Sequence, residues 1–217
     1  LNQENLITVL HVSDIHDNPQ AYDVIEQLHT QFAIDAVIDT GDIVSWGTPL
    51  ENELLRRIGT LDIPYVYVSG NHDGAAAAAT IAAQPNATVV ENEVVEVAGL
   101  RIAGIGDPRF AADDDSDAGG WREGDEAVNA AIFQLGDTIE SYDEEHPEDP
   151  VDVALIHDPT QPEGLLGRVP LVLSGHMHTS DVELDREDSG TDWLTVGSTG
   201  GALASGGVAP VLQGDDP

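Results

Sequence analysis

The sequence predicts an α/β fold, a four-layer α/β/β/α sandwich in which two mixed β-sheets pack face to face with helices outside. In the first half, apolar strand-like runs alternate with stretches of helical spacing, which is the pattern of parallel βαβ units. The second half is richer in short strands and so calls for a second sheet. The 217 residues fit one domain, 1–217, with a sizeable core.

Helical and strand periodicities define the elements of the first half. Pro19 suits the first turn of a helix, and apolar residues then recur at Val24, Ile25, Leu28 and Phe32. The expected strands are Leu6–Val12, Ala36–Ile38 and Tyr65–Val68, and the expected helices are Ala21–Gln31, Pro49–Leu61 and Ala75–Ala83.

The second half alternates short strands and turns around one long helix. Ala98-Gly99 suits a hairpin turn between two of these strands. We expect a helix at Asp125–Ser141 between an exposed loop, Asp107–Gly124, and an acidic linker, Tyr142–Pro150. The expected strands are Ala87–Val90, Glu93–Val97, Leu100–Ile105, Val151–Ile156, Leu171–Leu173, Val182–Leu184 and Trp193–Val196, before a Gly- and Ser-rich end at Gly197–Gly207.

The charge balance restricts the classes of partner. The chain has 41 acidic residues against 7 basic ones, all arginine, for a net charge of −34. Nucleic-acid binding depends on cations that neutralise phosphates, so we expect no nucleic-acid partner. The acidity favours a surface adapted to high salt, whose stability rises with salt, over acidic runs that are merely solvated loops. Without cysteine, any metal must be held by nitrogen and oxygen ligands.

Five of the predicted strands end in metal-ligating or proton-moving side chains. Ligands of α/β sheets bind at the carboxyl ends of strands, so these residues are expected to meet. They are Asp14-x-His16, Asp42, Asn71-His72-Asp73, His157 and His176-x-His178. A single such histidine is more often structural, and His29 and His146 are assigned to the surface. His11, inside the first strand, is assigned to the core or to a position behind the site.

These five blocks, taken together, resemble the calcineurin-like metallophosphoesterase superfamily. The resemblance implies that Asp14, His16 and His178 hold one metal and that Asn71, His157 and His176 hold a second. It also implies that Asp42 bridges both metals and that His72 assists the leaving group rather than ligating. The implied protein is an enzyme, a metal-dependent phosphoric ester hydrolase.

The chemistry of these residues agrees with the implied roles. Two divalent cations about 3.5–4 Å apart need an anionic bridge such as Asp42, and water shared between them becomes a hydroxide that attacks phosphorus. Imidazole with carboxylate suits Mn, Fe, Zn, Co or Ni, of which manganese or iron is expected here. The substrate that the resemblance implies is a small phosphodiester, phosphomonoester or lipid-linked phosphate. A nuclease is disfavoured by charge, and a silent binding scaffold of the same fold is the remaining alternative.

Three assignments stay open at the level of sequence. Asp73 either orients His72 as part of the catalytic set or caps its loop. Arg109 and Asn71 are expected to contact the substrate phosphate, but Arg109 could equally pair with the Asp113–Asp115 run. The blocks around Asp14, Gly106–Phe110 and Gly197–Gly201 are similar to bacterial metallophosphoesterases with an N-terminal membrane segment.

The similarity to membrane-attached metallophosphoesterases bears on where in the cell the protein is expected. No run of about 18 apolar residues is present, and the chain opens with Leu1, so we expect an excised piece of a longer product. A membrane tether outside this fragment would place it on the extracytoplasmic face, with the cytoplasm as the alternative. The oligomeric state is not predicted.

Overall fold

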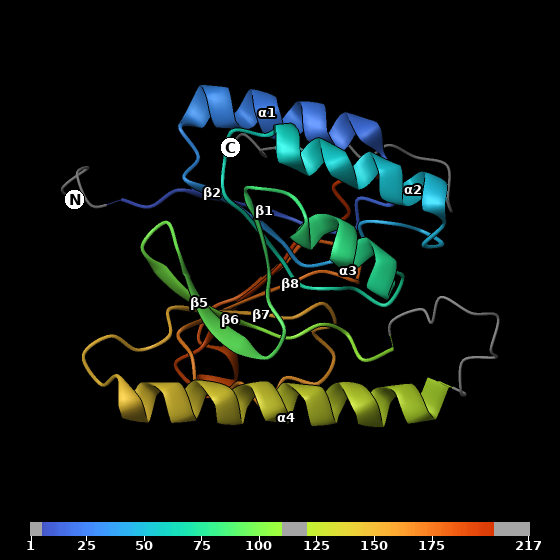
Figure 1. Ribbon diagram of the computed structural model, residues 1–217. Coiled ribbons are helices and arrows are strands. Elements are labelled where there is room, and N and C mark those ends of the chain that lie inside the picture. Colours follow the sequence, from blue (N-terminus) through green and yellow to red (C-terminus); the bar gives the residue numbers. More distant parts are fainter. Residues whose placement is uncertain (1–5, 110–120, 202–217) are drawn as a thin grey trace, which may run out of the picture.

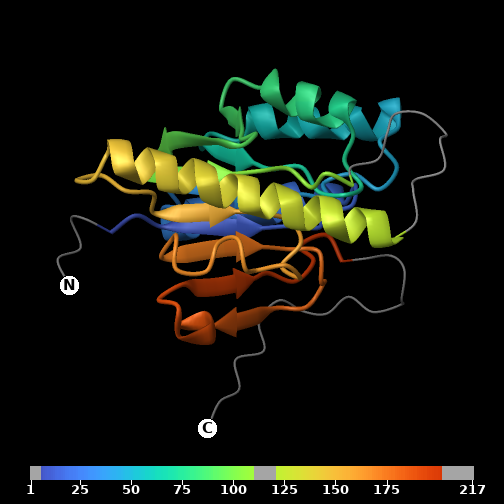
Figure 2. The ribbon, with the colours of Figure 1, turned by 90° about the horizontal axis from the view of Figure 1, so that it is seen from below.

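The computed structural model describes residues 6–109 and 121–201, and these fold into four layers (Figure 1). Three helices cover the outer face of one sheet, namely α1 (Pro19–Phe32), α2 (Pro49–Leu54) and α3 (Ala75–Ala82). The long helix α4 (Trp121–Glu145) runs across the other sheet, as Figure 2 shows from below. The predicted α/β/β/α sandwich is confirmed.

The first sheet has the order β1-β2-β3-β4, and all its strands are parallel. They are β1 (Val9–Val12), β2 (Ala36–Asp39), β3 (Tyr65–Tyr67) and β4 (Ala87–Val89). The expectation of two mixed sheets is therefore wrong for this one. Each of its strands is joined to the next by a helix on the outer face, and a helical crossover makes neighbouring strands parallel.

The second sheet is mixed and has the order β5-β6-β7-β8-β10-β9. Its four central strands are parallel, while the edge strands β5 and β9 run antiparallel to their neighbours. The strands are β5 (Glu93–Val97), β6 (Leu100–Gly104), β7 (Val153–Leu155), β8 (Leu171–Ser174), β9 (Asp181–Glu183) and β10 (Asp192–Thr195).

Side chains that point alternately to the two faces of each strand form the core between the layers. In β3, Tyr65 and Tyr67 face the helices α1–α3, while Val66 packs against the second sheet. Side chains of a strand point alternately to its two faces, so a strand buried on both sides reads as a continuous apolar run. This is why the sequence showed unbroken apolar stretches before each candidate ligand.

Local capping signals set the helix starts. Asn18 caps α1 through its side chain and Pro19 takes the first helical position. Thr48 and Glu51 form a reciprocal capping box at the start of α2. The predicted helix Pro49–Leu61 is, however, α-helical only to Leu54 and continues as a 3₁₀ helix over Leu55–Thr60, where Gly59 and Thr60 have weak helix propensity.

Helix α4 is longer than predicted. It begins at Trp121, inside the expected loop, and ends at Glu145, inside the expected acidic linker. The Asp113–Asp115 run and the end of the chain beyond residue 201 lie outside the described residues. Ala98 and Gly99 both have positive φ, as the predicted two-residue hairpin requires. Within the described ranges, no helix is long and apolar enough to cross a membrane.

Candidate metal centre

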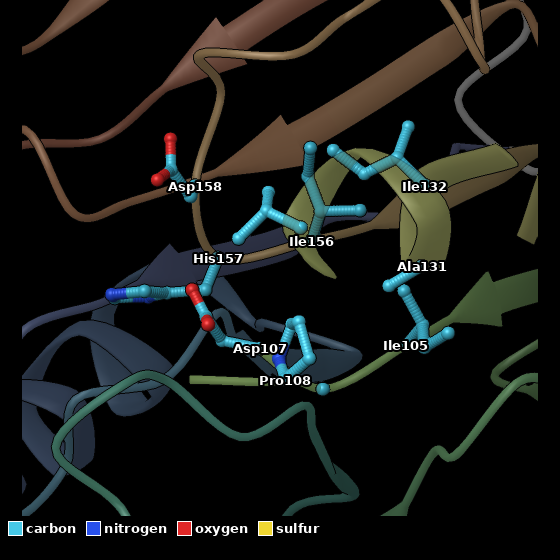
Figure 3. Close-up of a pocket in the computed structure, with 10 residues that line it drawn as sticks. Ile105, Asp107, Pro108, Ala131, Ile132, Ile156, His157 and Asp158 are labelled. Atoms are coloured by element: carbon cyan, nitrogen blue, oxygen red, sulfur yellow. The ribbon is translucent and has the colours of Figure 1, made fainter. Parts of the chain in front are cut away.

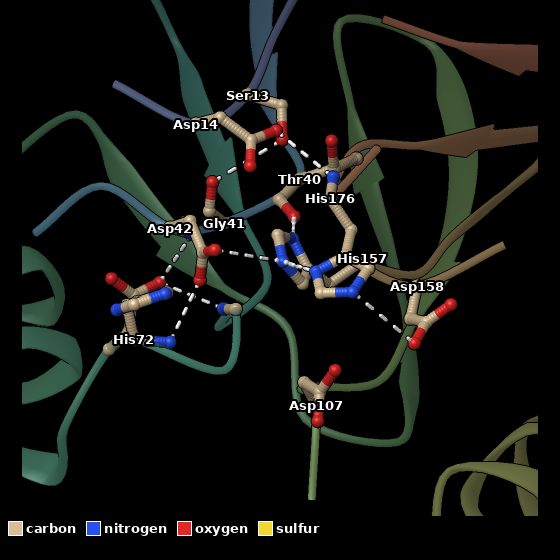
Figure 4. Close-up of polar contacts among 12 residues, drawn as sticks. Ser13, Asp14, Thr40, Gly41, Asp42, His72, Asp107, His157, Asp158 and His176 are labelled. Atoms are coloured by element: carbon tan, nitrogen blue, oxygen red, sulfur yellow. Dashed lines mark hydrogen bonds and ion pairs between the residues drawn. The ribbon is translucent and has the colours of Figure 1, made fainter. Parts of the chain in front are cut away.

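All seven predicted ligands lie at the carboxyl ends of parallel strands from both sheets. Asp14 and His16 follow β1, and Asp42 follows β2. Asn71 and His72 follow β3. His157 follows β7, and His176 and His178 follow β8, so that the two sheets meet at one site (Figure 4).

The first group that could hold a metal ion consists of Asp14, His16 and His178. Asp14 Oδ1 lies 3.1 Å from Nε2 of His178 and 3.9 Å from Nε2 of His16. The two imidazole nitrogens are 3.3 Å apart. This group is the more open one, since the side chain of His178 is 38% exposed.

The second group that could hold a metal ion consists of Asp42, His157 and His176. His157 Nε2 lies 3.2 Å from Asp42 Oδ2 and 3.2 Å from Nδ1 of His176. Asp42 Oδ2 is also 4.0 Å from Nε2 of His16 in the first group. One carboxylate oxygen therefore faces both groups.

Unpaired oxygens in the site fit cations as the missing partners. Asp14 Oδ1 and Asn71 Oδ1 are buried and make no hydrogen bond within the described part of the chain. Buried polar atoms are nearly always paired, because an unpaired one costs about 1–3 kcal/mol. The other oxygen of Asp14 accepts a hydrogen bond from the His176 backbone, so the carboxylate is held with Oδ1 directed at the histidines. The donor set of imidazole, carboxylate and amide oxygen suits divalent transition metals.

The backbone around these residues is strained. Five of the predicted ligands have positive φ, which is uncommon for residues other than glycine: Asp14, His16, Asp42, His176 and His178. Such strain collects at functional sites, where the surrounding fold enforces it. Gly41 also has a positive φ of 97°, and a Cβ there would collide with the backbone of Gly70.

His72 is held by the loop that follows β2. Its Nδ1 lies 3.0 Å from the carbonyl oxygen of Ser45, and its backbone N–H donates to Asp42 Oδ1 at 2.8 Å. A carbonyl can only accept, so Nδ1 carries the proton and Nε2 is the nitrogen left to interact with a substrate. The ring of His72 lies 5.2 Å from that of His16, next to the first group.

Within the described residues, no hydrogen bond joins the Asp73 carboxylate to the His72 ring, and this carboxylate makes its contacts beneath the site instead. Its carboxylate accepts five hydrogen bonds of 2.7–3.1 Å, from the hydroxyl of Tyr67 and from the backbone of Asp42, Ile43, Val44 and Gly70. These contacts support the loop-capping role. Asp73 shapes the loop that presents Asp42.

Asp42 and His157 are electrostatically paired. Burial raises the pKa of Asp42, but the neighbouring His157 and the backbone N–H of His72 outweigh burial and hold this pKa well below its usual range. Burial lowers the pKa of His157, yet the Asp42 carboxylate outweighs it and raises this pKa. Without a metal, the pair is therefore an ion pair, and a cation that binds there must displace a proton.

Arg109 lies beside the second group but is bound to carboxylates. Its Nε and Nη2 donate to the two oxygens of Asp107 at 3.0 and 2.6 Å, and Nη2 also donates to Asp158 at 2.6 Å. Asp158 Oδ2 in turn lies 3.7 Å from Nε2 of His176. The expected partners of Arg109, Asp113–Asp115, lie outside the described residues.

A small cavity adjoins the second group between α4 and the ends of β6 and β7 (Figure 3). Apolar side chains such as Ile105, Ile132 and Ile156 line it, together with His157 and Asp158. Its volume of about 10 Å³ has room for roughly one water molecule. A cavity of this size is too small for a phosphoester.

The Gly197–Gly201 segment packs behind the first group. Thr199 and Gly200 donate backbone hydrogen bonds to the carbonyls of Ser13 and Asp14, and the hydroxyl of Ser198 donates to the carbonyl of Asp14. This segment fixes the strained loop that carries Asp14.

Sequence reasoning missed two residues that hold the site. Ser45 acts through its backbone carbonyl, which no sequence pattern reveals. Asp158 directly follows His157 at a strand end, and this adjacency was the available signal.

A family model described as "Calcineurin-like phosphoesterase" matches residues 7–180, most of the chain and all five ligand blocks. The chain belongs to the calcineurin-like phosphoesterase family. No curated protein matches significantly.

Solved structures share the fold of this calcineurin-like phosphoesterase at low sequence identity. TT1561 of Thermus thermophilus has a TM-score of 0.62 and 15% identity, covering 88% of this chain and 89% of its own. A dimetal phosphatase from Danio rerio has a TM-score of 0.60 and 12% identity, with 89% and 88% covered. GAP50, the anchor in the inner membrane complex of Plasmodium, has a TM-score of 0.58 and 14% identity, with 94% and 76% covered.

Proposed function

We propose that this protein is a dinuclear metal-dependent phosphoesterase acting on small phosphodiesters, phosphomonoesters or lipid-linked phosphates. One observation carries the proposal: Asp42 Oδ2 faces both groups of ligating residues, at 3.2 Å from His157 and 4.0 Å from His16. Two cations held so close together need a shared anion between them.

Asp14, His16 and His178 would hold the first cation, Asn71, His157 and His176 the second, and Asp42 both. For this donor set we favour manganese or iron as the bound metal. When bound, the cations supply a water of lowered pKa and stabilise negative charge on the phosphoryl oxygens.

His72 would act on the leaving group. Its Nδ1–H is committed to the carbonyl of Ser45, so a proton reaches the substrate from Nε2 of the imidazolium form. The contact with Ser45 also fixes the ring, because rotation about the side chain would break it. An oriented proton donor of this kind contributes about 10²–10⁴-fold to rate.

The substrate class follows from charge and access. A net charge of −34 disfavours a nucleic-acid polymer, whereas a single phosphoester can reach the cations from the side of His178. Asn71 and the cations are the groups best placed to receive its phosphate.

The test is hydrolysis of p-nitrophenyl phosphate and its bis ester by the purified chain with Mn²⁺, in dilute buffer and in molar NaCl. We expect metal-dependent turnover, abolished by chelation and restored by Mn²⁺. His72→Asn should bind the metal normally but lose about 10²–10⁴-fold in kcat. His146→Asn is the matched control, because His146 is exposed and stacks on Tyr142 of α4. No hydrolysis with any divalent ion would favour the alternative of a binding scaffold without catalysis.

A further inference from the structure

The two histidines of the second group are oriented by different partners. His157 directs Nε2 at Asp42, and its Nδ1 lies 2.7 Å from the carbonyl of Thr40. His176 is turned the other way, with Nδ1 directed at His157 and Nε2 at the carboxylate of Asp158. Figure 4 shows Asp158 on the far side of His176 from Asp42.

An imidazole ligates a metal through one ring nitrogen, and the other one is here called the far nitrogen. The group that contacts the far nitrogen sets the tautomer and the basicity of the ring. A carboxylate or carbonyl in that place typically changes metal affinity by about 10–100-fold. Thr40 serves His157 in this way through a hydrogen bond. For His176, Asp158 is the group in that position, at an ion-pair distance of 3.7 Å.

Asp158 is itself held in place. Its side chain is 3% exposed, and it accepts hydrogen bonds from the backbone N–H of Thr160 and from Nη2 of Arg109. These two hydrogen bonds fix the carboxylate beside His176.

Arg109 is fixed from two further sides. It forms a bidentate pair with Asp107, whose side chain is 1% exposed. Gly124 of α4 lies against its stem, where a Cβ would approach Cδ of Arg109 to 2.9 Å. Bonds to two carboxylates occupy the Nε and Nη2 donors, so this guanidinium is arranged to hold Asp158 rather than to capture a phosphate.

We propose that Asp158, held by Arg109 and Asp107, is the positioning residue for His176 and thereby sets the affinity of the second metal group. This inference rests on the proposed function in so far as His176 is a ligand. It replaces the expected phosphate clamp at Arg109 with an indirect role. Arg109 acts through Asp158 and touches neither substrate nor metal.

The same two strands provide a matched control at their opposite ends. Arg101 of β6 forms a bidentate pair with Asp152, just before β7, at 2.9 Å for both contacts. Arg109 and Asp158 form their pair just after β6 and β7. Both pairs join an arginine to an aspartate at the ends of β6 and β7, but only the pair of Arg109 and Asp158 lies beside a histidine of the site.

The experiment is a titration of the metal-free full chain with Co²⁺, followed by visible absorption, with Mn²⁺ calorimetry as a second readout. We expect two binding sites in the unsubstituted protein. Asp158→Asn and Arg109→Gln should each weaken one of the two by about 10–100-fold and leave the other unchanged. Arg101→Gln should change neither affinity. If Asp158→Asn does not fold, Arg109→Gln decides, because it keeps the buried carboxylate.

Different failures point to different errors. Two metals bound with unchanged affinity in both variants overturns the positioning role while leaving the dinuclear centre intact. A raised KM for bis-p-nitrophenyl phosphate in Arg109→Gln, with normal metal binding, restores the phosphate clamp. Absence of metal binding in the unsubstituted chain overturns the proposed function itself.

Discussion

The two candidate metal-ligand groups differ in how their histidines are held. In the second group, the far nitrogens of His157 and His176 face Thr40 and Asp158. In the first group, no hydrogen bond within the described ranges fixes the far nitrogens of His16 and His178, whose Nε2 atoms face each other. The side chain of His157 is fully buried, whereas that of His178 is 38% exposed.

This difference predicts an order of metal binding. A buried, preorganised group loses less conformational freedom when it binds an ion, so the second group should hold its metal more tightly. The first group should exchange its metal more readily, because it is the more exposed of the two.

The largest effect is expected at Asp42, because its Oδ2 faces both groups. Asp42→Asn should reduce kcat/KM for bis-p-nitrophenyl phosphate by at least about 10³-fold, since the neutral amide no longer offsets the repulsion of two cations. Steady-state assays with Mn²⁺ measure this. Asp137→Asn is the control, because Asp137 on α4 is 75% exposed. A loss below tenfold would contradict a shared ligand.

Asp73→Asn should lower stability rather than remove a catalytic group. The carboxylate accepts five hydrogen bonds in a buried position, and an amide cannot accept all of them, so we expect a loss of about 3 kcal/mol in the free energy of unfolding. Urea unfolding of the metal-free protein measures it. Unchanged stability with a large fall in kcat would return Asp73 to the catalytic set.

Removing one histidine from each group tests the predicted order directly. His178→Ala should retain one tightly bound equivalent of Mn²⁺, whereas His157→Ala should weaken the tightest site by about 100-fold. Equilibrium dialysis at limiting Mn²⁺ distinguishes the two variants. The reverse result would show that exposure, not preorganisation, governs affinity here.

A further effect, which depends on pH, concerns Asp39, behind the site at the end of β2. Burial raises the pKa of Asp39 to about 8, only partly offset by hydrogen bonds from Tyr65 and Gly41. Between the usual carboxyl pKa and about 8, the folded state therefore binds one proton more than the unfolded state, and stability falls as pH rises.

The substitution Asp39→Asn removes this pH-dependent contribution to the free energy of unfolding. Relative to the unsubstituted chain, the free energy of unfolding of the variant should rise with pH by up to about 1.4 kcal/mol per pH unit across that window. Urea unfolding in EDTA at pH 5, 6, 7 and 8 measures the difference. A difference that stays constant with pH would show that Asp39 is ionised throughout.

The meeting of the candidate ligands at one site was predictable from sequence, because each follows a strand and parallel strands bring their carboxyl ends together. The layers were predictable for a similar reason, since helical spacing and apolar runs alternate along the chain. The orientation of the side chains was not predictable from the sequence. Asp73 follows His72 in the sequence, yet the strained loop turns its carboxylate under Asp42.

Contacts between distant segments were equally hidden. Arg109 and Asp158 are 49 residues apart, and their pairing depends on β6 and β7 being neighbours in the second sheet. The early start of α4 at Trp121 was not indicated by the local sequence pattern either.

The dinuclear centre is tested most directly by anomalous diffraction from crystals of the chain grown with Mn²⁺. We predict two peaks, one among Asp14, His16 and His178 and the other among Asp42, His157 and His176, with Asp42 Oδ2 ligating both ions. A single peak, or manganese bound only to acidic residues elsewhere on the surface, would contradict the proposed centre.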